Sequence, residues 1–146
     1  MRRPVPGMTI ESQPQEVLLR LVLWGEARGE SSLGKLAVLW VIRNRAAKTG
    51  KSISDVILAP LQFSSFNAND PNRAQMLDAW RHDAATWTAI DALCELAETW
   101  PALPDPTKGA DHYYVANMLN PPKWGRGSKD WNETTMIGRH VFGICP

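Results

Sequence analysis

The sequence predicts a mainly α-helical domain of α+β type, with a buried central helix and a small β element near the C-terminus. Three observations predict this fold class. Apolar residues recur at helical spacing over residues 15–49 and again over 74–100. A short tyrosine-containing run and a glycine turn between apolar residues follow Gly109. The 146 residues are 44% hydrophobic and 21% charged, which is typical of one globular domain, and no repeat or linker divides residues 1–146.

The first helix is expected to begin near Gln15, where apolar residues start to repeat three and four positions apart. Gly25 and Gly29 indicate that it ends there, which places Glu26 near a helix C-terminus. Residues 1–13 precede this helix and are rich in proline and polar residues. We therefore expect them to form a flexible N-terminal segment.

The central helix is predicted to follow Ser31 and Ser32, either of which is a good N-cap residue. Apolar residues from Leu33 to Ile42 cover every face of this helix, so it should be buried on all sides. Gly50 is the expected C-terminal stop.

The middle of the chain predicts further helices separated by loops. Ser52 or Ser54 can cap a short helix over residues 55–58, which Pro60 ends. Residues 67–72 have the composition of a turn and loop. A long helical region over 74–100 is expected to break near His82 and Asp83.

The C-terminal part changes character after Gly109. Residues 112–115 indicate a strand, and residues 120–127 a loop rich in proline and glycine. Residues 134–145 indicate a hairpin that turns at Gly138 and Arg139, or a strand beside a turn. These strands are the small β element predicted near the C-terminus.

Charge and cysteine content exclude several classes of function. Sixteen basic and 15 acidic residues give a net charge of +1, which does not favour nucleic acid as a partner. Cys94 and Cys145 lie far apart without a CxxC motif, so neither a zinc ribbon nor a disulfide scaffold is expected. The first residues lack the apolar run of a secretory signal or membrane span. We expect a monomer that is made in the cytoplasm and does not insert stably into membranes.

The most unusual cluster of residues is WGEARGE, over residues 24–30. Phosphate-binding loops, dinucleotide-binding glycines, HExxH and GxSxG motifs do not occur in the sequence, which leaves acid–base chemistry. A glycosidic bond breaks when a carboxylic acid protonates the leaving oxygen. Glu26 suits that role, because neighbouring Trp24 and the negative end of the helix dipole both favour a protonated carboxyl group. Gly25 should leave room for a bulky substrate.

At these residues the sequence resembles the SleB-like cell wall hydrolases, the spore cortex-lytic type. The resemblance begins with Gly25 to Glu30, continues through Ala37–Val38 and Asn44–Arg45, and covers most of the chain. Its further blocks follow in the family's order: Gln62-Phe63-Ser64, Asp105-Pro106-Thr107, Gly109-Ala110, His112-Tyr113-Tyr114, Ile137-Gly138, His140 and Phe142.

The resemblance implies a lysozyme-superfamily fold and cleavage of the MurNAc–GlcNAc backbone of peptidoglycan, with Glu26 as general acid and base. Since Glu26 is the one carboxylate placed with a clear role, we expect a lytic transglycosylase, with a muramidase as the other outcome. Lys35 and residues 66–87 depart from the family pattern, and we expect no separate wall-binding domain beside these motifs. These departures favour a single-domain phage endolysin that reaches the cell wall, in the periplasm, after release from the cytoplasm.

Several residues of the shared blocks are candidates for substrate binding. Gln62 and Ser64 can hydrogen-bond sugar hydroxyl or N-acetyl groups, and Phe63 can stack on a sugar ring. Trp24 is a further candidate for sugar contact. Tyr113 and Tyr114 alternate on the expected strand, so one should face the cleft and the other the core.

Other polar residues of the motifs are expected to support the site. Glu30 should be structural, pairing with Arg28 or capping the next helix, and Asp105 with Thr107 should fix a turn. The remaining two supporting residues, His112 and His140, can orient loops through their ring nitrogens. We expect no cofactor and no metal, because a zinc site would need at least a third ligand, for which the candidates are Asp111 and His82.

Two alternatives stay open at this point. One is a metal-dependent amidase or peptidase that cuts the wall peptides. The other is a non-catalytic glycan-binding module that uses some of the seven tryptophans. Trp40, Trp80 and Trp87 occupy apolar helical positions, which leaves Trp24, Trp124 and Trp131 for sugar contact and weakens the second alternative.

Overall fold

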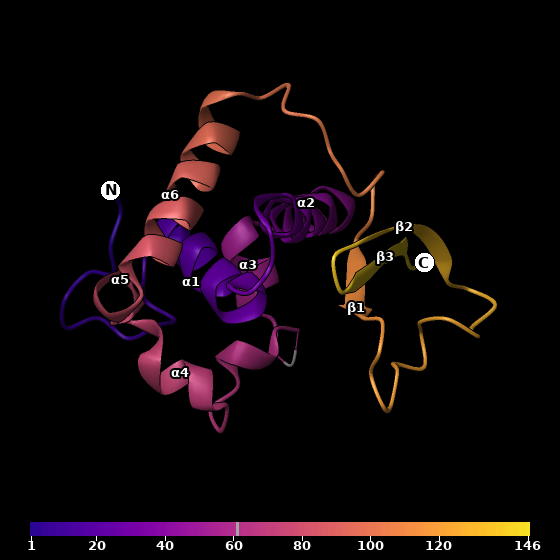
Figure 1. Ribbon diagram of the computed structural model, residues 1–146, viewed down its shortest axis with the longest axis horizontal. Helices are drawn as coiled ribbons and strands as arrows, with labels where there is room; N and C mark the ends of the chain where they lie inside the picture. The colour runs from indigo at the N-terminus through magenta and orange to yellow at the C-terminus, as the bar shows by residue number, and fades with distance from the viewer. Residues whose placement is uncertain (61) are drawn as a thin grey trace.

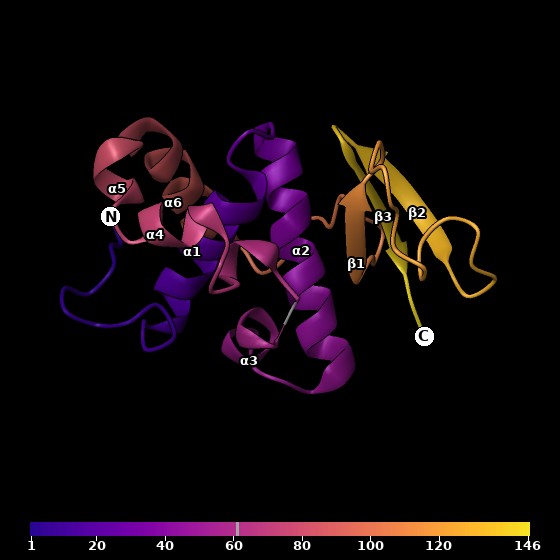
Figure 2. The same cartoon turned by 90° about the horizontal axis from the view of Figure 1, so that it is seen from below.

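The computed structural model describes residues 1–60 and 62–146, and its helices and strands form three layers. Helix α2 lies between a group of helices on one side and a three-stranded sheet on the other (Figures 1 and 2). The two termini lie at opposite ends of the molecule. In chain order the elements are α1 (Gln15–Ala27), α2 (Ser32–Thr49), α3 (Ile53–Leu58), the 3-10 helix η1 (Ser64–Phe66), α4 (Pro71–Met76), α5 (Ala79–His82), α6 (Ala84–Thr99), β1 (His112–Val115), β2 (Asn132–Ile137) and β3 (His140–Ile144).

Helix α2 has the predicted ends. The Ser31 hydroxyl accepts a hydrogen bond from Gly34 N at 3.1 Å, and Gly50 ends the helix with a φ of 70°, a left-handed conformation that favours glycine. Its apolar residues serve two cores. Leu39 and Ile42 pack with the other helices, whereas Val41 packs against Phe142 of the sheet. Burial on all sides holds only for the middle of the helix, because Leu33 near its start and residues 47–49 at its end are exposed.

The region after residue 70 contains three helices in place of one long one. The expected break near His82 and Asp83 is present, and α4 ends earlier, at Met76. Helix α4 also begins inside the run predicted as a loop. Asp70 accepts a hydrogen bond from Asn72 N at 2.8 Å, and Pro71 occupies the first helical turn, where a proline is tolerated.

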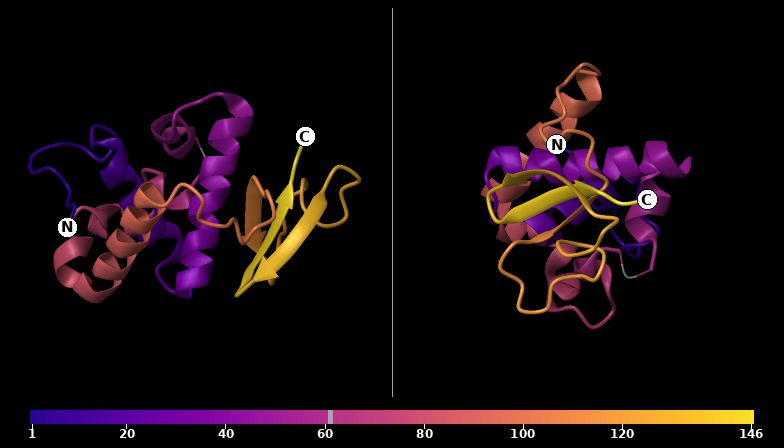
Figure 3. Two further views of the ribbon diagram at one scale, coloured as in Figure 1. Left: turned by 90° about the horizontal axis from the view of Figure 1, so that it is seen from above. Right: turned by 90° about the vertical axis from the view of Figure 1, so that its right-hand side faces the viewer.

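The sheet has the antiparallel order β1-β3-β2, and β1 is the strand next to α2 (Figure 3). Strands β2 and β3 form the predicted hairpin, with Gly138 at a φ of 56° between Ile137 and its partner His140. In the β1–β3 register, Tyr113 faces Phe142 across the ladder. Docking of β1 on α2 brings this tyrosine toward the C-terminal end of α1.

The N-terminal segment has no regular secondary structure and packs on the helices. Arg2 N donates to Asp91 Oδ1 at 3.1 Å, and the Trp87 indole donates to Arg2 O at 2.9 Å. Ile10 is buried in the helical core. In the part of the chain that the structure describes, no helix has the length and apolarity needed to cross a membrane.

Candidate active site

A cleft of about 640 Å³ opens between the C-terminal end of α1, α2, the residues around η1, strand β1 and the loop that follows it. Glu26 lines this cleft. Most residues that the sequence suggested for the site are also in its lining: Gln62, Phe63, Ser64, His112, Tyr113, Tyr114 and His140. Trp24, Glu30, Asp105 and Thr107 are not.

Glu26 is the penultimate residue of α1, and both of its carboxyl oxygens are held. Oε2 accepts a hydrogen bond from Ser65 N at 3.1 Å, and Oε1 accepts one from the Tyr113 hydroxyl at 3.3 Å. Adjacent Gly25 permits the first contact, because a Cβ there would lie 2.4 Å from Ser65 Oγ. Ser65 and Met76 occupy the space that a side chain at position 25 would take, and Gly25 also lines the cleft.

The two tyrosines of β1 face opposite ways, as the strand period requires. Burial and the neighbouring Glu26 carboxylate raise the pKa of Tyr113 well above its ordinary value, so this hydroxyl keeps its proton and donates. Tyr114 points to the other side of β1 and still lines the cleft beside Trp124. Its ring centroid lies 5.7 Å from that of Trp124 and 5.6 Å from that of Trp131. Its hydroxyl accepts a hydrogen bond from Arg126 N at 3.0 Å. Tyr114 thus holds the 120–131 loop, outside the helical core.

The loop before η1 places Gln62 and Ser64 at the cleft with exposed side chains. Gln62 Oε1 accepts a hydrogen bond from Arg45 Nη1 at 2.8 Å. Phe63 is only 2% exposed, and the Arg45 guanidinium lies 5.7 Å from its ring centroid. Stacking of Phe63 on a sugar does not fit this arrangement, because its ring is already covered by protein.

Trp24 does not reach the cleft. It is 2% exposed, its indole nitrogen donates to Asp83 Oδ2 at 3.0 Å, and the guanidinium of Arg28 lies 4.3 Å from its ring centroid. Its ring also packs edge-on against His82. The prediction that Trp24 contacts sugar is wrong, because the side chain points from α1 into the helical layer. Trp124, 39% exposed, lines the cleft instead.

Glu30 is nearly buried and pairs with the β2–β3 turn, not with Arg28. Its carboxylate accepts hydrogen bonds from Arg139 N at 3.3 Å and Arg139 Nε at 3.2 Å, and His140 Nδ1 lies 3.6 Å away. Burial acts to raise the pKa of Glu30, but the donors of Arg139 and the His140 ring outweigh it and lower that pKa. Glu30 therefore ties the end of α1 to the sheet.

His140 is buried beneath Tyr113, with 4.8 Å between the two ring centroids. Burial lowers its pKa, so the ring is neutral near pH 7.

Asp105 lies in the loop before β1, where Oδ1 accepts from the Thr107 backbone and hydroxyl and Oδ2 from Gly109 N and Asn44 Nδ2. These four hydrogen bonds hold the loop of Asp105 and Thr107 in place, and neither residue lines the cleft.

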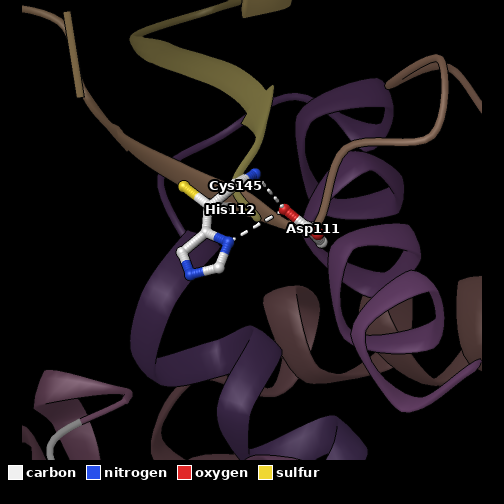
Figure 4. Close-up of side chains that lie close together, drawn as sticks. All are labelled: Asp111, His112 and Cys145. Carbon is white, nitrogen blue, oxygen red and sulfur yellow. Dashed lines mark hydrogen bonds and ion pairs between the residues drawn. The ribbon is translucent and has the colours of Figure 1, made fainter. Parts of the chain in front are cut away.

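Asp111 lies directly before β1, and its carboxylate accepts hydrogen bonds from neighbouring residues at this end of the strand (Figure 4). Oδ1 accepts from His112 Nδ1 at 2.9 Å and from Cys145 N at 3.0 Å, while Oδ2 accepts from Lys48 Nζ at 2.6 Å. Since a carboxylate only accepts, the His112 proton resides on Nδ1. Burial lowers the pKa of His112, so its other ring nitrogen is an unprotonated acceptor at neutral pH.

The ligand atoms of Asp111, His112 and Cys145 lie within 4.8 Å of one another, as a metal site would require. The Lys48 ammonium already neutralises Asp111, however, so a bound cation would have to displace it. Burial also raises the pKa of the Cys145 thiol, which disfavours the thiolate that a metal needs. Among the described residues this group includes neither His82 nor His140, two of the residues considered for a zinc site.

Comparison with known proteins decides the family. The family model for cell wall hydrolases matches residues 29–143. The chain belongs to the cell wall hydrolase family. The match begins three residues after Glu26, so the assignment of this carboxylate rests on the site geometry and on the motif around it.

The chain is similar to the spore cortex-lytic enzyme of Bacillus subtilis (strain 168), with 29% identity over 128 residues. The matched region is 86% of this chain and 36% of the relative. A spore cortex-lytic enzyme of Bacillus cereus is 29% identical over 135 residues, 90% of this chain and 44% of the relative. The chain thus spans less than half the length of these relatives.

Two solved structures share the fold. The catalytic domain of the germination-specific lytic transglycosylase SleB from Bacillus anthracis gives a TM-score of 0.63 at 23% identity, covering 97% of this chain and 99% of that one. The catalytic domain of Bacillus cereus SleB gives 0.61 at 23% identity, covering 100% and 98%. The predicted SleB-like family and the mainly helical fold with a small sheet are confirmed.

Proposed function

We propose that this cell wall hydrolase cleaves the MurNAc–GlcNAc backbone of peptidoglycan, with Glu26 as general acid and base. The observation that carries the proposal is the Glu26 carboxyl group in the wall of the cleft, oriented from two sides by Ser65 N and the Tyr113 hydroxyl. A cleft of about 640 Å³ is large enough for sugar rings. The names of the relatives, spore cortex-lytic enzyme and lytic transglycosylase, support the same substrate.

The reaction would begin with proton transfer from Glu26 to the glycosidic oxygen as that bond breaks. The ionised Glu26 would then accept the proton of the C6 hydroxyl of muramic acid while this oxygen attacks C1, which gives a 1,6-anhydro end. Among the residues that the structure describes, Glu26 is the single acidic side chain in the cleft lining. A hydrolase normally needs a second carboxylate. The arrangement therefore favours the lytic transglycosylase over the muramidase.

The biological setting is part of the proposal. A monomeric enzyme made in the cytoplasm and released at lysis would meet peptidoglycan as a phage endolysin. Against a non-catalytic glycan-binding module stands the Glu26 carboxyl group, which two donors orient in the wall of the cleft. Against a metal-dependent amidase stands Lys48, which already occupies the carboxylate of the Asp111 group.

Product analysis tests this function. Purified peptidoglycan digested in ¹⁸O-water should yield muropeptides with 1,6-anhydro ends and no label by mass spectrometry. Glu26→Gln should lower the rate by roughly 10²- to 10⁴-fold with an unchanged melting temperature. Glu95→Gln, on the exposed face of α6, is the matched control and should behave as wild type. Labelled reducing ends would replace the transglycosylase by a muramidase, and a fully active Glu26→Gln would overturn the role of this residue.

A further inference from the structure

A second cavity of about 270 Å³ adjoins the cleft. The two share Arg45, Gln62 and His112 in their linings, so the second cavity adjoins the part of the cleft wall that these residues form. Lys48 and Lys51, at the C-terminal end of α2 and just beyond it, complete its charged wall. The proposed reaction at Glu26 does not use this cavity.

Arg45 stands at the junction of the two cavities as a cation without a counter-ion. Nε and Nη2 donate to the carbonyl oxygen of Asp111 at 3.0 and 2.8 Å, and Nη1 donates to Gln62 Oε1. In residues 1–60 and 62–146, no carboxylate oxygen lies within 4.0 Å of its guanidinium nitrogens. Three of its five N–H donors are used, so two remain for a ligand. A partly buried guanidinium of this kind is suited to a carboxylate.

The charges around the second cavity favour an anion. Its lining includes Arg45, Lys48 and Lys51 against the side-chain carboxylate of Asp111 and the terminal carboxyl group of Pro146. The Asp111 carboxylate is directed at Lys48 and His112. Lys51 is exposed and makes no side-chain hydrogen bond or ion pair with the described residues. Arg45 and Lys51 therefore have no carboxylate partner within 4.0 Å among the described residues, in a cavity that joins the cleft.

We propose that the second cavity binds the carboxylates of the stem peptide attached to muramic acid. This inference rests on the proposed function, because it requires a muramic acid residue beside Glu26. The stem peptide leaves the sugar through the lactyl group and carries free carboxylates. Of the groups on a peptidoglycan strand, these are the anions closest to the cleaved bond. Arg45 would bind a carboxylate at the junction, and Lys51 would attract a second one farther along the peptide.

Selective removal of the stem charges tests the subsite. Soluble, un-cross-linked glycan strands are digested before and after their stem carboxylates are converted to amides with a carbodiimide and ammonium. Amidation keeps the peptide length and removes the charge. Wild type should cleave the untreated strands with a kcat/KM about tenfold higher, the scale of one charged hydrogen bond.

Lys51→Glu should lower this ratio to below about threefold, since it reverses a charge at the cavity without removing a contact in the free protein. Lys129→Glu makes the same charge change on an exposed residue outside both cavities and should keep the wild-type ratio. Equal wild-type rates on the two substrates, or an unchanged ratio in Lys51→Glu, would overturn the subsite while leaving the proposed function intact. Cleavage of neither substrate by wild type would instead remove the proposed function, and the subsite with it.

Discussion

The Tyr113 hydroxyl donates a hydrogen bond to Glu26 Oε1 at 3.3 Å and so joins the sheet to the end of α1. The two residues are 87 positions apart in the chain. Ser65 N holds the other carboxyl oxygen from the helical side. The geometry of the carboxyl group therefore depends on both layers, and the site forms only when β1 packs on α2.

Replacing Tyr113 by phenylalanine should slow the reaction without unfolding the protein. The change removes one donor to Glu26 and keeps the ring that packs on His140 and Phe142. We expect kcat to fall about tenfold, as for the loss of one hydrogen bond of about 1.4 kcal/mol, with KM within about twofold of wild type. Steady-state kinetics on soluble glycan strands measures both constants.

The neighbouring Tyr114→Phe is the control for Tyr113→Phe. It removes the acceptor for Arg126 N and should loosen the loop that carries Trp124, raising KM more than it lowers kcat. If Tyr113→Phe changed only KM, or neither constant, the orienting role of Tyr113 would have to be abandoned.

Glu30→Gln should lower stability and retain activity in the folded protein. The carboxylate is 5% exposed and accepts a hydrogen bond from the backbone N–H of Arg139, whereas the Arg139 guanidinium is mostly exposed and contributes little. We expect a loss of about 1–3 kcal/mol. Thermal unfolding should show it as a fall of roughly 3–10 °C in Tm.

Glu133→Gln breaks an exposed pair with Arg126 and should change Tm by far less than Glu30→Gln does. An inactive but stably folded Glu30→Gln, together with an active Glu26→Gln, would require the two glutamates to exchange roles.

The sequence predicts well those features that depend on neighbours in the chain. Ser31 and Gly50 end α2 as expected, because a cap needs only residues within one turn. The hairpin turn at Gly138 and the alternation of Tyr113 and Tyr114 are equally local. The same local reasoning places Glu26 at the end of α1.

Features that depend on distant contacts could not be predicted in this way. Glu30 pairs with Arg139, which lies 109 positions away in the chain. The sequence alone equally favoured a pairing with Arg28, the basic residue nearest to it in the chain. Trp24 and Phe63 are both next to site residues, yet which way each ring points depends on how α1 packs and on Arg45. The role of Arg45 was missed for the same reason, since its acceptors lie on Gln62 and Asp111.

Removal of divalent metals should leave the activity unchanged. The group of Asp111, His112 and Cys145 is explained by the hydrogen bonds of Asp111 and its pairing with Lys48. Wall lysis should therefore proceed equally before and after treatment with EDTA. Loss of lysis with EDTA and its return on adding zinc would make the metal-dependent amidase the better assignment.

The Asp105→Asn variant should be less stable at neutral pH, and its deficit should shrink in acid. Burial acts to raise the pKa of Asp105, but the hydrogen bonds from Thr107, Asn44 and Gly109 outweigh it and hold that pKa below the ordinary value of about 3.9. A depressed native pKa means that the unfolded chain binds the proton more readily. The contribution of Asp105 is therefore complete well above pH 4 and is lost as the pH falls through the native pKa.

Asp105→Asn replaces one acceptor oxygen by an amide and removes the charge, so we expect a cost of about 1–3 kcal/mol at pH 7. Thermal unfolding of wild type and variant at pH 7, 5, 4 and 3 measures the difference in Tm. Asp130→Asn is the control, because this exposed loop side chain accepts no hydrogen bond from the described residues. A Tm difference for Asp105→Asn that stays constant from pH 7 to pH 3 would mean that the ionised carboxylate is not what holds this loop in place.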